Sequence, residues 1–236
     1  MKGRLAFIVL LAIMVSACGG TESLPTIGPS SVSTPIPPVL KQGTLWSDLP
    51  PLSEEAKNFI IQNNIQWVYP GGDAGAVKRW DSFPIPIYAS PDFRAQDLVS
   101  AVNLWQSASN GKITFQIVSS SAEAKIVLDT QWPPPDFGNP SAGACGVGAP
   151  RMAKGNAIIF GLGHYAFKVK GDLCDVNVNK SIDLAHEIGH IVLSTHGHTP
   201  SGTDVMSSPS FIWKMSPFLS EVTNWLYSVP PGTRPK

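Results

Sequence analysis

Apolar residues in the middle of the chain follow the short periods of β-strands. Residues 83–89 (FPIPIYA) alternate apolar residues with others, and their prolines favour a strand start or a sheet edge. Three further apolar runs, KITFQIVS, AKIVLDT and NAIIFGL, predict strands at residues 112–119, 124–130 and 156–162. The Gly-rich segment at residues 143–152 is interpreted as an exposed edge strand.

Other segments repeat apolar residues with the longer period of helices. This pattern predicts helices within residues 90–111, at about 181–193 and at 218–228. A shorter helix is predicted at residues 53–63, where Ser53 is a suitable N-cap and acidic residues fill the first turn. Together the elements predict an α+β fold, in which a mixed, twisted sheet of about five strands packs with the helices.

Composition supports one ordered domain with many turns. Hydrophobic residues make up 43% of the chain, and 22 prolines and 21 glycines indicate numerous loops. The 17 basic residues balance the 17 acidic ones, so no nucleic-acid partner is expected.

The N-terminus has the pattern of an export signal. Lys2 and Arg4 precede an apolar run, residues 5–15, that is short for a membrane span, and small residues follow. Residues 1–17 are therefore predicted to be a signal peptide. The cysteine after them, Cys18, resembles the lipidated cysteine of bacterial lipoproteins; an ordinary cleaved signal with a chance cysteine is the alternative.

The signal is followed by three regions of different composition. Residues 18–45 are rich in Pro, Ser and Thr and predict an extended tether. Residues 46–76 form an N-terminal extension that carries the short helix and is expected to pack on the main domain; a latency role is a further possibility. Residues 77–236 are predicted to form that domain.

Two cysteines remain after Cys18. An even pair in an exported chain, Cys145 and Cys174, predicts a disulfide, with metal binding as the alternative. In the chain-entropy model, closing this loop contributes about 3–4 kcal/mol.

The third predicted helix contains the motif H-E-x-x-H. His186 and His190 are four residues apart, so both imidazoles lie on one helix face and can bind one zinc ion. Glu187 is offset by about 100° and can reach a water on that ion. Zinc acidifies such a water, and a carboxylate can take its proton as the water attacks a carbonyl.

A third ligand must come from beyond the helix. His196, six residues after His190, is the preferred candidate, and His198 and Asp204 are alternatives. Asp204 is expected instead to support the turn before Met206 through hydrogen bonds. Glu221 would suit a glutamate-liganded site, but its surroundings do not match one.

These motifs resemble the metzincin zinc proteases, and most of all their matrixin-like group. The family pattern is H-E-x-x-H-x-x-G-x-x-H followed by a Met-turn. The resemblance implies that His186, His190 and His196 bind zinc, that Glu187 is the general base and that Met206 lies beneath the metal. It covers residues 77–228 and implies that the segment at 143–152 pairs with a peptide substrate.

The chain departs from the family pattern at Leu193, where the family has glycine. That glycine ends the helix, so we expect the helix to break near Leu193, with an unusual backbone angle there or at a neighbouring residue. On this basis, replacement of Leu193 by glycine should be tolerated. Where some metzincins have a tyrosine ligand, this chain has Ser208.

The sequence thus predicts a monomeric zinc endopeptidase that cleaves protein or peptide substrates. It is expected to be exported and held by its N-terminal lipid on the outer face of a bacterial-type membrane. The alternative is a non-proteolytic surface lipoprotein that keeps the fold as a binding or assembly module.

Overall fold

The structure is a computed structural model that describes residues 43–67, 74–129, 147–151, 156–160, 180–195, 197–200, 202–208 and 212–236. The signal peptide, Cys18, Cys145 and Cys174 lie outside these residues, as does most of the tether. Lipidation and the disulfide therefore stay predictions. None of the described helices is long and apolar enough to cross a lipid bilayer.

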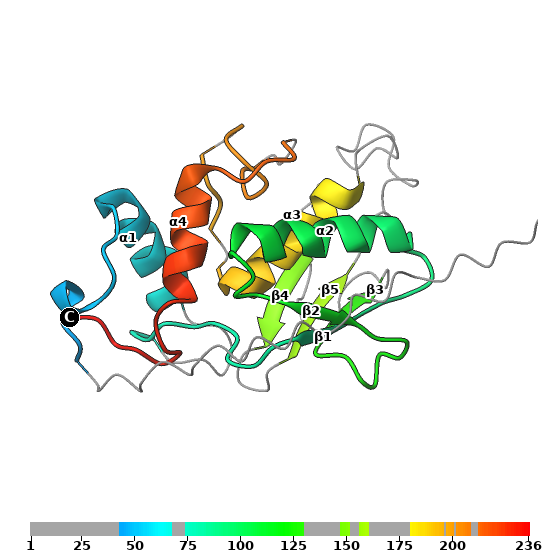
Figure 1. Cartoon of the computed structure of the whole chain (residues 1–236), viewed down its shortest axis with the longest axis horizontal. Helices are drawn as coiled ribbons and strands as arrows, with labels where there is room; N and C mark the ends of the chain where they lie inside the picture. The colour runs from blue at the N-terminus through cyan, green and yellow to red at the C-terminus, as the bar shows by residue number, and fades with distance from the viewer. Residues whose placement is uncertain are drawn as a thin grey trace, which may run out of the picture. The chain divides into compact units, whose positions relative to one another are not determined.

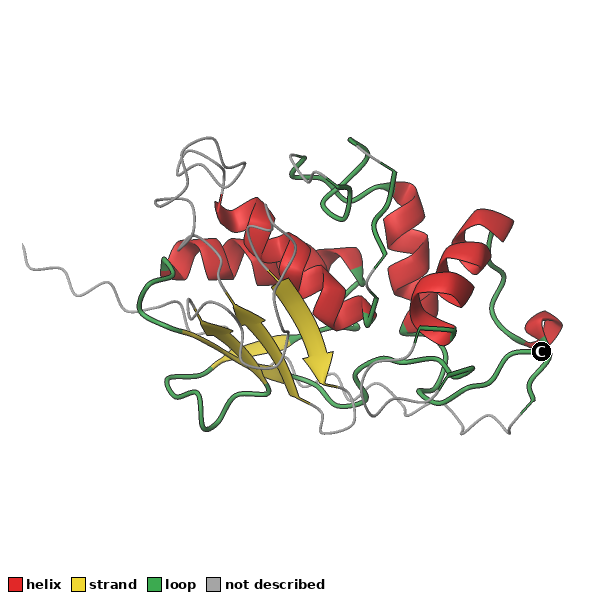
Figure 2. Cartoon of the chain, turned by 180° about the vertical axis from the view of Figure 1, so that it is seen from behind, coloured by secondary structure: helices red, strands yellow, loops and turns green. Residues whose placement is uncertain are grey.

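The described strands form a mixed sheet in the order β2-β1-β3-β5-β4. Strands β1, β2, β3 and β5 run parallel, and β4 pairs antiparallel with β5 at the edge (Figure 2). The strands are β1 (Ile85–Ala89), β2 (Phe115–Ile117), β3 (Ile126–Asp129), β4 (Val147–Arg151) and β5 (Asn156–Phe160). The expected edge position of the Gly-rich segment is confirmed for the described strands, since β4 ends their order.

Strand β1 lies inside the sheet, so the alternative of a sheet edge for residues 83–89 is wrong. Pro86 is tolerated there because of its position at the strand start. Its carbonyl accepts a hydrogen bond from the Lys125 amide (2.8 Å), and pairing with β3 begins one residue later, at Ile87. The amide hydrogen that proline lacks would therefore lie before the first residue paired with β3.

Two long helices pack together against the sheet. Helix α2 (Ala95–Ala108) lies along α3 (Lys180–Leu193), the helix that carries H-E-x-x-H (Figure 1). Trp105 of α2 is fully buried, and its indole nitrogen donates to the Ala185 carbonyl of α3 at 2.8 Å. The combination of helices with a mixed sheet is as predicted.

The N-terminal extension is part of the same hydrophobic core. It contains a short 3-10 turn, α1 (Glu54–Ile60) and a π-helical turn (Ile61–Ile65). Ile60 is fully buried in the hydrophobic core, which also contains the buried apolar residues of α3 and α4 (Pro217–Leu226).

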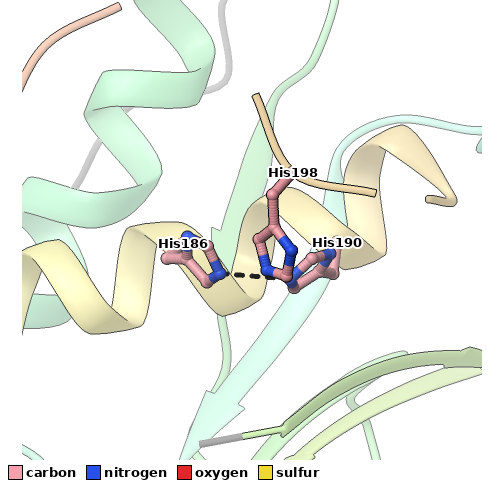
Figure 3. A group of neighbouring side chains, drawn as sticks. All are labelled: His186, His190 and His198. Atoms are coloured by element: carbon pink, nitrogen blue, oxygen red, sulfur yellow. Dashed lines mark hydrogen bonds between the residues drawn. The ribbon is translucent and has the colours of Figure 1, made fainter. Parts of the chain in front are cut away.

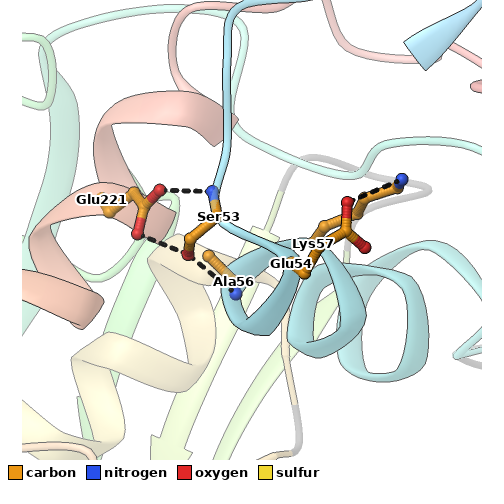
Figure 4. A network of polar contacts seen from close by, with 5 residues as sticks. All are labelled: Ser53, Glu54, Ala56, Lys57 and Glu221. Atoms are coloured by element: carbon orange, nitrogen blue, oxygen red, sulfur yellow. Dashed lines mark hydrogen bonds and ion pairs between the residues drawn. The ribbon is translucent and has the colours of Figure 1, made fainter.

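One polar contact fixes the start of α1 against α4. The Glu221 carboxylate accepts hydrogen bonds from the Ser53 amide (2.7 Å) and hydroxyl (2.8 Å), and the Ser53 hydroxyl accepts from the Ala56 amide as an N-cap (Figure 4). Glu221 therefore serves the packing of the extension.

Candidate metal centre

The two histidines of α3 face each other as their spacing predicts. Their Nε2 atoms are 3.1 Å apart, and each residue is less than a tenth exposed (Figure 3). Two nitrogens bound at about 2.0–2.1 Å to one tetrahedral zinc ion lie about 3.3 Å apart. His186 and His190 therefore have nearly the separation that a shared ion requires.

Main-chain carbonyls determine which nitrogen of each ring is available. The Nδ1 atom of His186 lies 2.8 Å from the Val205 oxygen, and that of His190 lies 2.9 Å from the Thr195 oxygen. A carbonyl only accepts, so each Nδ1 carries the hydrogen. Each neutral ring then presents the lone pair of Nε2, which is how histidine binds a metal.

Burial keeps one of these rings neutral. It lowers the pKa of His186 to about 4, and the neighbouring His198 lowers it further, while the Val205 carbonyl acts in the opposite direction. His186 is thus uncharged at neutral and mildly acidic pH, as a metal ligand must be.

The third histidine of the cluster is His198. Its ring stacks on His186, with centroids 5.1 Å apart and planes at 15°, and meets His190 edge-on at 5.0 Å. A ligand atom from each of the three residues lies within 4.8 Å of the others. His198 is exposed, so the cluster is buried on the helix side and open on the loop side. Three imidazoles make a donor set that suits zinc.

His196, the preferred third ligand from the sequence, lies outside the described residues. Its role stays a prediction. The sequence favours His196 over His198 because only His196 has the family spacing. Histidines on both sides of Gly197 were the available signal, and spacing alone could not decide between them.

Helix α3 ends in a regular turn just after Leu193. The Thr195 amide donates to the His190 carbonyl (3.1 Å), the Ser194 amide donates to the Ile191 carbonyl (3.3 Å), and Ser194 has φ +49°. This is the hydrogen-bond pattern of a Schellman motif. The expected unusual backbone angle is confirmed, and it falls on Ser194.

Leu193 itself is helical and fully buried. The strain that the prediction of a tolerated glycine relied on is therefore not at this position. Glycine there would relieve no strain, and it would leave a cavity in the core.

Met206, which the resemblance places beneath the metal, lies against α3. It is fully buried, and a Cβ added to Gly189 would lie 2.2 Å from its sulfur and 2.5 Å from Trp105. Gly189 lies on α3 between the two histidines, so only a residue without a side chain allows this contact.

Asp204 supports the turn before Met206, as predicted. Its buried carboxylate accepts from the Met206 amide (2.9 Å), from the Thr199 hydroxyl (2.5 Å) and from the Ser216 hydroxyl. These bonds hold the neighbouring Val205 carbonyl, which orients His186. Asp204 thus acts on the cluster through the backbone, and the candidate ligands in the described residues are all histidines.

Glu187 follows His186 on α3 and is 8% exposed. Its role as a general base stays a prediction.

No protein-family model matches the sequence, and no curated protein shows significant similarity to it.

Proposed function

We propose that this chain is a zinc-dependent endopeptidase of metzincin architecture. The observation that carries the proposal is the cluster of His186, His190 and His198, in which carbonyls direct two Nε2 atoms at each other. Histidine clusters also occur in structural sites. The exposure of His198 supports an accessible site, because a catalytic zinc needs an open position.

The three histidines would hold the ion in this proposal. When bound, zinc supplies Lewis acidity that polarises a carbonyl and acidifies water. Glu187, one residue from His186, accepts a proton from the attacking water and passes it to the leaving amine.

The strand order supports a binding mode for the peptide. Strand β4 ends the sheet and packs beside α3, so its outer backbone groups lie near the histidine helix. A peptide extended along this edge would add a strand and bring its carbonyl toward the site.

The variant Glu187→Gln distinguishes a protease from a protein that only binds zinc. The variant should keep the fold and bind about one zinc ion per chain, and it should lose cleavage of a peptide library by a factor of at least about a hundred. Digests read by mass spectrometry measure the cleavage, and elemental analysis measures the zinc. A variant that cleaves as well as the wild type would exclude Glu187 as the base. If the zinc-loaded wild type cleaves no peptide, the chain is a binding or assembly module.

Export and lipid anchoring through Cys18 belong to the same proposal. They rest on the pattern of residues 1–18, and they would place the site on the outer face of a bacterial-type membrane.

A further inference from the structure

Two asparagines of the N-terminal extension contact the segment that leads from α3 to His198. Asn64 is 2% exposed, and its Nδ2 donates to the carbonyls of Leu193 (2.8 Å), Ser194 (3.3 Å) and Lys78 (2.7 Å). The first two are carbonyls at the C-terminal end of α3, where no further turn of the helix can pair with them. Asn64 thus caps the ligand-bearing helix from a segment about 130 residues earlier in the chain.

The second asparagine contacts the backbone beside the third histidine. A Cβ added to Gly197 would lie 2.1 Å from Oδ1 and 2.2 Å from Cγ of Asn63. The Asn63 amide is held in turn by a bond from Nδ2 to the Phe59 carbonyl (3.0 Å). The extension therefore presents a fixed polar surface to the residue that precedes His198.

Thr195, which lies between these contacts, also affects the geometry of the site. The Thr195 carbonyl orients His190, and the Thr195 hydroxyl accepts from the Gly197 amide at 3.0 Å. Ser194 thus meets Asn64, and Gly197 meets Asn63. A shift of Thr195 would change the orientation of His190, and a shift of Gly197 would change the position of His198.

We propose that Asn63 and Asn64 are positioning residues for the metal centre, so that the extension is a permanent part of the site and not a removable latency segment. The inference rests on the proposed zinc site. It adds that metal affinity depends on a contact made far from the H-E-x-x-H motif.

The decisive experiment uses Gly197→Ala in the full chain. Zn²⁺ affinity is measured by competition with a chromophoric chelator, and the Co²⁺ absorption spectrum reports the coordination geometry. The added methyl group should displace the His198 segment and lower Zn²⁺ affinity at least tenfold, while the thermal midpoint of the metal-free protein changes little. Asn63→Ala alone should also lower the affinity, because it removes the surface that holds Gly197. It also removes the atoms that the methyl group meets, so adding Gly197→Ala to Asn63→Ala should lower the affinity little further.

Asn64→Ala provides a second arm, with Ser53→Ala as the matched control. Ser53 caps α1 in the same extension but contacts α4. Both variants should lower the thermal midpoint, and only Asn64→Ala should also lower Zn²⁺ affinity. If Asn64→Ala does not fold, the Gly197 variants decide alone.

Unchanged affinity in Gly197→Ala or in Asn63→Ala would overturn the inference while leaving the zinc site intact. A wild-type chain that binds no Zn²⁺ would overturn the proposed function, and this inference with it.

Discussion

At the scale of single residues, main-chain carbonyls aim the two helix imidazoles. Val205 orients His186 and Thr195 orients His190, and both carbonyls belong to loops that follow α3. Ligand geometry therefore depends on loop conformation as much as on the helix. Such supporting partners typically contribute 10–100-fold to metal affinity.

Replacement of His198 is the direct test of the third ligand. His198→Ala removes a nitrogen of the cluster and should lower Zn²⁺ affinity by more than the roughly 100-fold typical of a lost supporting bond. His196→Ala tests the ligand that the family spacing predicts. Chelator competition measures both, and a loss in His196→Ala larger than that in His198→Ala would assign the third-ligand role to His196.

At the scale of elements, two neighbouring residues at the end of α3 have different roles. Leu193 is a buried helical residue, whereas Ser194 has the left-handed backbone. Leu193→Gly should therefore destabilise the protein by about 3–5 kcal/mol through a cavity and lost helix propensity. Ser194→Gly should stay within about 1 kcal/mol of the wild type, because glycine accepts this φ. Urea unfolding measures both, and a tolerated glycine at 193 would contradict the helix end described above.

The first turn of α3 contains a group whose protonation should affect stability. Burial raises the pKa of Asp183 to about 6, so the folded state binds a proton more readily than the unfolded chain. Protonation of Asp183 should therefore raise the free energy of unfolding as pH falls from about 6 to 4. Above pH 6 the ionised carboxylate lowers the free energy of unfolding by at most about 3 kcal/mol, and solvent screening makes this effect smaller.

Asp183→Asn isolates this contribution. The variant should be more stable than the wild type at pH 8, and the difference should shrink towards pH 4. His186 acts in the opposite direction, because its lowered pKa costs stability as pH falls from 6.5 to about 4, but both proteins share that effect. Urea unfolding of the metal-free proteins at the two pH values measures the difference, and an equal gap at both would contradict the shift.

At the scale of the whole molecule, the N-terminus is predicted to determine location. Cys18→Ala should release the protein from the membrane fraction, because multiple acyl chains give stable anchoring that a tether alone does not. Cell fractionation with immunodetection measures the effect, and Cys145→Ala, which keeps Cys18, is the control. An unchanged membrane fraction in Cys18→Ala would indicate another means of attachment.

The sequence by itself determined what depends on local periodicity. The 3.6-residue period placed His186 and His190 on one face of α3, and short apolar runs located the strands, because side-chain direction follows directly from backbone repeat. The role of Asp204 also followed from its short separation from Met206.

Only the tertiary structure decided the contacts that involve loops and distant segments. His198 joins the helix pair through a loop whose path has no repeat, and Asn64 reaches Leu193 across 129 positions. Likewise, Glu221 binds Ser53 across 168 positions. No local pattern encodes such pairs, because they form only when the packing of the core brings separate segments together.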